Sequence, residues 1–131
     1  MPEAQRPRIL IVDDDELILD ALQRQLHSRF DVITALGGNE AMRLVLTRGP
    51  FAVIVSDLRM PGMDGVTLLY LIRQAAPDTV RVLLTGQTDM EAASAAVNEG
   101  NIFRFLLKPC PSGALLRALD AAVKQYQSLQ K

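Results

Sequence analysis

Five short apolar runs, each followed by a stretch with helical spacing, constrain the fold of this chain more than any other feature. The runs predict strands over Arg8–Val12, Phe30–Thr34, Phe51–Ser56, Val80–Leu84 and Ile102–Leu106. The first run, RILIV, is apolar without alternation, which is typical of a strand buried on both faces of a parallel sheet. Alternating strands and helices need right-handed crossovers. We therefore expect one doubly wound α/β domain with helices on both faces of the sheet.

The stretches between the runs predict helices. Apolar spacing indicates helices over Glu16–Ser28, after a turn at Gly37–Asn39, over Asp64–Gln74, over Asp89–Glu99, and from near Pro111 to Tyr126. Asp64 is a good N-cap for the third helix, and Gly100 is a good C-cap for the fourth. The fourth helix is rich in alanine and carries little apolar bulk, so we expect few bulky contacts to hold it.

Composition narrows the class of protein. The 131 residues are 49% hydrophobic and 22% charged, which fits a single soluble domain. A net charge of −1 argues against a chain built mainly to bind nucleic acid or anionic membrane. No run is long enough to span a membrane, and residues 1–7 lack a signal-peptide core, so we expect a cytoplasmic protein with a flexible segment at 1–7.

The segment Val53–Gly65 (VIVSDLRMPGMDG) ends a predicted strand with a carboxylate and then breaks the strand pattern. Asp57 is the last residue before the break, because Pro61-Gly62 cannot continue a central strand. Taken alone, Asp57 fits a loop-capping aspartate as well as a functional one. The ends of the other strands decide between these interpretations.

The carboxyl ends of the predicted strands carry three carboxylates, one hydroxyl and one ammonium. In chain order these belong to Asp13, Asp14, Asp57, Thr85 and Lys108. In a parallel sheet these ends share one edge, where three carboxylates repel one another unless protonated or bridged by a cation. An all-oxygen set favours Mg²⁺, and a carboxylate can attack a phosphoryl group to form an acyl phosphate. Singly, each residue also fits a helix cap, a turn hydroxyl or a solvated lysine; together they predict a magnesium-dependent aspartyl-phosphate site.

The motifs at these strand ends resemble the receiver domain of two-component response regulators. The resemblance covers residues 8–126 and rests on Val12-Asp13-Asp14, Ser56-Asp57, Met60–Gly65, Leu84-Thr85-Gly86 and Phe105–Pro109. It implies a flavodoxin-like (βα)5 fold with strand order 2-1-3-4-5. Residues 127–131 are then expected to be a tail or the start of a linker helix.

The resemblance also implies ligands for the metal. Asp57 matches the phosphoacceptor and a metal ligand, and Asp14 matches a direct ligand of Mg²⁺. Asp13 is expected to act mainly through a metal-bound water. The backbone carbonyl of Arg59 matches the third protein ligand.

Three further residues match the parts that respond to phosphorylation. Lys108 is expected to pair with Asp57 or its phosphoryl group, and the Lys108–Pro109 bond is expected to be cis. Thr85 matches the residue that moves to a phosphoryl oxygen, and Phe105 matches the aromatic residue that turns inward with it. The resemblance implies that these movements switch the surface formed by the fourth helix, fifth strand and fifth helix.

The implied partners are a sensor histidine kinase or phosphotransfer protein, and an output domain or effector that contacts the switch surface. A homodimer through this surface is compatible with the resemblance, whereas direct contact with nucleic acid or membrane is not expected. The tract Leu83–Pro109 is similar to receivers that precede phosphodiesterase domains of the HD-GYP type or belong to hydrogenase-type transcriptional regulators. The polar end, residues 124–131, favours part of a longer regulator over a stand-alone receiver.

Two other functions compete with a signalling receiver. A magnesium-dependent phosphohydrolase normally needs a carboxylate two residues after the nucleophile, where this chain has Arg59, and a capping insertion, for which the loops are too short. An interaction module without the chemistry would be indicated by loss of Asp57, Asp14 or Lys108, and all three are present. We therefore expect no enzyme beyond a domain that catalyses its own phosphorylation and dephosphorylation.

Overall fold

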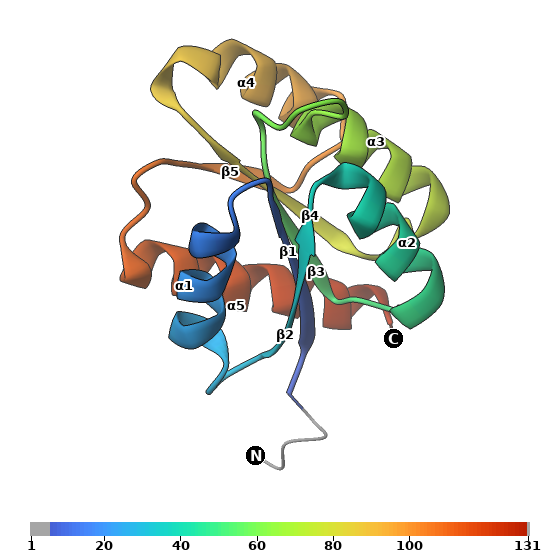
Figure 1. Ribbon diagram of the computed structural model, residues 1–131. Coiled ribbons are helices and arrows are strands. Elements are labelled where there is room, and N and C mark those ends of the chain that lie inside the picture. The colour runs from blue at the N-terminus through green and yellow to red at the C-terminus, as the bar shows by residue number, and fades with distance from the viewer. Residues whose placement is uncertain (1–5, 131) are drawn as a thin grey trace.

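The computed structural model describes residues 6–130, and within this range five parallel strands form one sheet in the order β2-β1-β3-β4-β5 (Figure 1). The strands are β1 (Arg8–Asp13), β2 (Asp31–Leu36), β3 (Val53–Asp57), β4 (Val80–Thr85) and β5 (Arg104–Leu107). Every neighbouring pair is parallel. The predicted fold class and strand order are confirmed.

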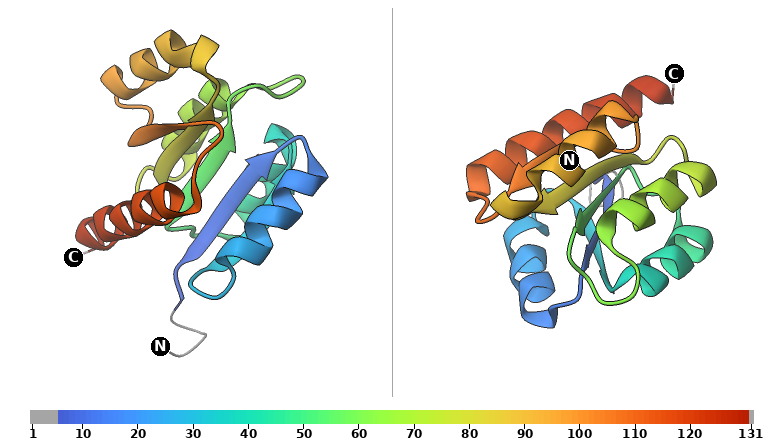
Figure 2. Two further views of the ribbon diagram at one scale, coloured as in Figure 1. Left: turned by 90° about the vertical axis from the view of Figure 1, so that its left-hand side faces the viewer. Right: turned by 90° about the horizontal axis from the view of Figure 1, so that it is seen from above.

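The described residues also contain five α-helices, which follow the strands in turn. They are α1 (Glu16–Leu26), α2 (Gly38–Arg48), α3 (Gly65–Ala75), α4 (Met90–Asn98) and α5 (Ser112–Leu129). A single 3₁₀ turn, η2 (Gln87–Asp89), precedes α4. Figure 2 shows α4 beside β5, at the edge of the sheet opposite to β2. No helix in the described range is both long and apolar enough to cross a lipid bilayer.

Both faces of the sheet are covered because alternate side chains of a strand point in opposite directions. In β1, Ile9 and Ile11 pack with residues of α1 and α5, whereas Leu10 and Val12 pack with residues of α2, α3 and α4. Figure 1 shows α1 and α5 on one side of the sheet and α2 and α3 on the other. This double burial explains why the first apolar run shows no alternation.

The start of α3 fixes the end of β3. Asp64 is the N-cap of α3, as predicted, and its side chain accepts a hydrogen bond from the backbone N–H of Thr67 at 2.8 Å. Gly65 follows, and a Cβ at this position would collide with the carbonyl oxygen of Asp57. Only glycine therefore allows α3 to begin directly against the strand end that carries Asp57.

Several predicted element boundaries are wrong by one to three residues, and three of them have a clear structural reason. The turn at Gly37–Asn39 is shorter than predicted, because Gly37 adopts a φ of +89° at the N-cap and α2 begins at Gly38. The fifth strand begins at Arg104 instead of Ile102, which is buried in the core that α3 and α4 cover. The fourth helix begins at Met90, because Asp89 belongs to the 3₁₀ turn before it.

The two ends of the chain were predicted to lie outside the domain. Of the segment predicted as flexible, residues 1–7, only Arg6 and Pro7 are among the described residues. At the other end, α5 continues without a break from Ser112 to Leu129. The helix therefore extends three residues beyond Tyr126, into the stretch predicted as a tail or a linker helix.

Candidate functional site

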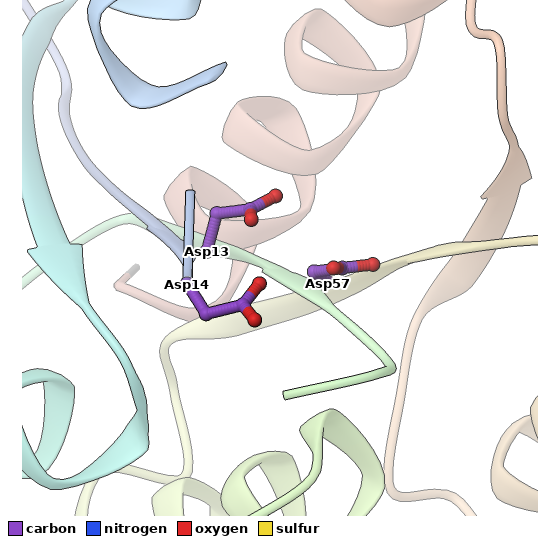
Figure 3. A group of neighbouring side chains, drawn as sticks. All are labelled: Asp13, Asp14 and Asp57. Atoms are coloured by element: carbon purple, nitrogen blue, oxygen red, sulfur yellow. The ribbon is translucent and has the colours of Figure 1, made fainter. Parts of the chain in front are cut away.

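Three carboxylates lie together at the carboxyl ends of β1 and β3. Asp13 ends β1, Asp14 follows it, and Asp57 ends the neighbouring strand β3. One oxygen of each carboxylate lies within 4.8 Å of the others (Figure 3). Asp13 and Asp57 are buried and Asp14 is exposed, so the cluster opens to solvent on one side. The structure thus brings together the three aspartates that the sequence singled out.

Asp13 has an oxygen without a partner. Its Oδ1 accepts a hydrogen bond from the backbone N–H of Asp15 at 3.0 Å, but its buried Oδ2 has no hydrogen-bond partner among the described residues. Burial, and to a smaller extent the charge of Asp57, raises the pKa of the Asp13 carboxyl to about 6. A buried carboxylate oxygen of this kind suits a cation or its bound water, and the oxygen-only donor set suits Mg²⁺. The residues present therefore fit the predicted metal.

Lys108 supplies the positive charge of the site. Its Nζ lies 2.5 Å from Oδ1 of Asp57, and its backbone N–H donates to the carbonyl oxygen of Thr85 at 2.9 Å. Lys108 follows β5, and its peptide bond to Pro109 is cis. The ammonium thus neutralises one oxygen of Asp57, while Asp13 and Asp14 lie near this carboxylate.

Among the described residues, the side chains of Thr85 and Phe105 make no hydrogen bond to the three carboxylates. Thr85 ends β4 and is fully buried, and its hydroxyl donates to the carbonyl oxygen of Gly86 at 3.2 Å. Phe105 lies on β5 opposite Leu83 and packs partly buried against the core on the α2, α3 and α4 side. The hydroxyl is therefore engaged locally and not with Asp57.

Arg59 carries a contact that the sequence analysis missed. It was singled out for its backbone carbonyl, yet its guanidinium forms an ion pair with Asp89 at the beginning of α4. Arg59 Nε lies 3.2 Å from Oδ1 and 3.1 Å from Oδ2 of Asp89, and Nη2 also donates to Oδ1. The pair lowers the pKa of the Asp89 carboxyl. The sequence held one signal for this ion pair, because Arg59 and Asp89 have opposite charges and follow the neighbouring strands β3 and β4.

The fold and the site together define a class of protein: a flavodoxin-like α/β domain with an acidic cluster and a lysine at the carboxyl edge of its sheet. Residues 9–120 match the sequence profile of the response regulator receiver domain. The chain belongs to the response regulator receiver domain family, whose members are phosphorylation-activated signalling domains. The predicted family is confirmed.

Similar proteins carry this domain in different settings. The hydrogenase transcriptional regulatory protein HoxA of Cupriavidus necator is 41% identical over 122 residues, which are 93% of this chain and 25% of the relative. An adenylate cyclase structure from Rhodopirellula baltica has a TM-score of 0.94 at 42% identity and covers 95% of this chain and 93% of that one. The signal receiver domain of an HD domain-containing protein from Pseudomonas fluorescens Pf-5 has a TM-score of 0.87 at 39% identity, covering 95% and 99%.

The chain spans about a quarter of the length of the curated relatives it matches, which include the DNA-binding transcriptional regulator NtrC as well as HoxA. The likeness to these relatives therefore concerns the receiver domain.

Proposed function

We propose that Asp57 is the phosphoacceptor of this receiver domain and that its phosphorylation switches the surface formed by α4, β5 and α5. The observation that carries the proposal is the position of the Asp57 carboxylate, which lies 2.5 Å from the ammonium of Lys108 and beside Asp13 and Asp14. A carboxylate oxygen of Asp57 forms a bond to phosphorus. The bond between phosphorus and the donor's nitrogen or oxygen breaks, and its electron pair leaves with the donor.

Lys108 and the Thr85 hydroxyl interact with different oxygens of the phosphoryl group. Lys108 already pairs with Oδ1 of Asp57, which leaves Oδ2 as the attacking atom. Lys108 then pairs with an oxygen of the bound phosphoryl group. Thr85 releases the carbonyl oxygen of Gly86 and donates its hydroxyl to a second phosphoryl oxygen.

The acidic cluster is the proposed binding site for Mg²⁺. Asp14, Asp57 and the backbone carbonyl of Arg59 would hold the ion, and Asp13 would act through a metal-bound water. The unpartnered Oδ2 of Asp13 supports this assignment. When bound, Mg²⁺ offsets the negative charge of the three carboxylates and of the phosphoryl oxygens.

The proposed partners follow from this chemistry. The phosphoryl group comes from a sensor histidine kinase or a phosphotransfer protein, and the switch surface contacts an output domain, an effector protein or a second copy of this chain. We propose that this receiver works in the cytoplasm and controls its output without contacting nucleic acid or membrane itself. The HoxA relative and the HD domain-containing relative support two kinds of output, transcriptional control and an HD domain.

The domain acts as a signalling module and catalyses only its own phosphorylation and dephosphorylation. Hydrolysis of other substrates would need a general acid or base two residues after Asp57. That position holds Arg59, whose guanidinium is paired with Asp89. This pairing argues against the phosphohydrolase alternative.

Intact-mass analysis of the folded chain with acetyl phosphate and Mg²⁺ tests the proposal. We expect a single base-labile phosphoryl adduct that depends on Mg²⁺ and is absent from Asp57→Asn. Asp78→Asn is a matched control, because Asp78 lies beyond α3, just before β4 and far from the strand ends that carry the site. Folded protein that forms no adduct, or Asp57→Asn protein that still forms one, would overturn the proposal.

A further inference from the structure

The helix α4 is held against the sheet by small side chains. Its buried residues are Ala93 and Ala96, whereas α3 buries Leu68, Leu69 and Ile72. Because stabilisation by burial scales with apolar area, two alanine methyl groups contribute much less than three branched side chains. The contacts at the two ends of α4 therefore matter more for its position than they do for α3.

The C-terminal end of α4 is fixed by two arginines from neighbouring elements. Arg73 of α3 donates to the carbonyl oxygen of Glu99 at 3.2 Å and to Oδ1 of Asn101 at 3.0 Å. Arg81 of β4 donates from Nε to the carbonyl oxygen of Asn101 at 2.8 Å. Asn101 is itself buried, and its backbone N–H donates to the carbonyl oxygen of Ala96 at 2.9 Å. This end is tied to both the sheet and α3.

The N-terminal end of α4 is held differently. The Arg59–Asp89 pair spans a cleft of about 640 Å³ between the β3–α3 loop and the beginning of α4. Within the described residues, no other hydrogen bond or ion pair joins residues 59–64 to residues 86–93. The Arg59 side chain is 78% exposed and that of Asp89 is 10% exposed, so water competes for the guanidinium. Such a pair is specific in geometry but weak in energy.

Asp89 also occupies the N-cap position of α4 without capping the helix. Asp15 and Asp64 occupy the position before α1 and α3, and each caps its helix by accepting a backbone N–H. Asp89 occupies the same position before α4, but its side chain makes no capping bond. Its carboxylate is directed to Arg59 instead. If the pair opens, the carboxylate can turn to the first-turn N–H groups of α4, which lowers the cost of opening.

We propose that the Arg59–Asp89 pair is a latch that holds the N-terminal end of α4 in its unphosphorylated position, with the C-terminal end at Gly100–Asn101 as the fixed pivot. Arg59 is a positioning residue that acts through Asp89. Asp89 lies four residues after Thr85, so movement of Thr85 towards a phosphoryl group displaces the segment that carries the latch. The link to phosphorylation rests on the function proposed above, whereas the latch itself does not.

Hydrogen exchange of the unphosphorylated, magnesium-free chain tests the latch without any phosphoryl chemistry. In Asp89→Asn, which loses the ion pair but retains a capping side chain, we expect the amides of residues 86–93 to exchange about fivefold faster. The amides of residues 99–102 keep their wild-type rates. Glu91→Gln is the matched control, because it removes one negative charge from the exposed first turn of α4, and it leaves both rates unchanged.

A double-mutant cycle separates the latch from two independent effects. Arg59→Gln is expected to accelerate exchange of residues 86–93 as much as Asp89→Asn does. The double variant is expected to be no faster than either single variant, because both remove the same interaction. Effects that multiply in the double variant, equal acceleration at both ends of α4, or no acceleration at all would each overturn the latch.

Phosphorylation of the same variants tests the link to function. With Mg²⁺ and acetyl phosphate, Asp89→Asn is expected to form the Asp57 adduct up to about fivefold faster than the wild type, because the latch no longer opposes the competent arrangement. Equal rates despite faster hydrogen exchange would overturn the role of the latch in switching. If no variant forms an adduct, the function proposed for Asp57 fails, and the exchange measurements still decide the latch.

Discussion

The two halves of the candidate site differ in how completely they are assembled. The acidic half, formed by Asp13, Asp14, Asp57 and Lys108, has its charges in place, with Lys108 already paired to Asp57. In the switching half, formed by Thr85 and the segment leading into α4, the Thr85 hydroxyl donates to Gly86 and not to the carboxylates, and only the Thr85 carbonyl oxygen meets the acidic half, by accepting the backbone N–H of Lys108. In the function proposed above, the acidic half is therefore prepared for chemistry, whereas the switching half has to move.

This difference follows from how each half is attached to the fold. Asp13 and Asp57 end β1 and β3, which are paired on both sides, as is β4, which ends at Thr85. Thr85 leads into η2 and α4, which bury two alanines and are held at their beginning by one ion pair. Rigid elements position reacting groups precisely, and weakly held segments are suited to conformational change.

Removing the ammonium from the acidic half is expected to have the largest effect. In Lys108→Met, Asp57 loses its positive partner beside two carboxylates, and the charge on the phosphoryl group is no longer offset. We expect the rate of adduct formation with acetyl phosphate to fall about 100-fold, as measured by intact mass. Lys124→Met, an exposed lysine on α5, is the control. A rate within a factor of two of the wild type would contradict the assignment of Lys108.

Neutralising Asp13 is expected to stabilise the acidic half when Mg²⁺ is absent. Asp13→Asn removes a buried charge that faces Asp57 and has an unpartnered oxygen. We expect the free energy of unfolding in urea, with chelator present, to rise by about 1–3 kcal/mol. Saturating Mg²⁺ should reduce this gain, because the ion stabilises the wild type more. The exposed Asp20→Asn serves as control, and an Asp13→Asn protein that is less stable in chelator would contradict the assignment.

Removal of the Thr85 hydroxyl is expected to abolish the conformational response of α4 without preventing phosphorylation of Asp57. Thr85→Ala should still form the Asp57 adduct, because no acidic or basic group is lost. Its unfolding free energy should fall by only about 1 kcal/mol, since the hydroxyl makes one neutral hydrogen bond. The response of α4 to phosphorylation should be lost in hydrogen exchange. A variant whose α4 still responds fully would show that the signal takes another route.

The pH dependence of stability gives the most specific effect. The pKa of the Asp13 carboxyl is about 6 in the folded chain and 3.8 for an ordinary aspartate, so the unfolded chain releases this proton first. Stability without Mg²⁺ should therefore fall as pH rises through this window, and be unaffected by Asp13 below it. Urea unfolding of wild type and Asp13→Asn should diverge progressively from pH 4 to pH 6. A difference that is constant over this range would contradict the raised pKa.

The acidic half could be predicted from the sequence because its residues end strands, and parallel strands end at one edge. The same rule placed Lys108 and Thr85 near the cluster. The boundaries that failed depend on packing: Ile102 is apolar and buried without being in a strand, and Gly37 provides the positive φ with which α2 begins. The Arg59–Asp89 pair could not be predicted because local rules assign Asp89 to capping α4, and a partner thirty positions away in the chain takes its carboxylate instead.

The central claim is that phosphorylation of Asp57 changes the conformation of the switching half. Hydrogen exchange with and without phosphorylation tests this claim most directly. The wild-type chain is compared with Mg²⁺ alone and with Mg²⁺ plus acetyl phosphate, and intact mass confirms the adduct. We predict changed exchange across residues 86–98 and β5, with β1 and residues 99–102 unchanged. An adduct at Asp57 that leaves residues 86–98 unchanged, or that alters β1 equally, would contradict the account.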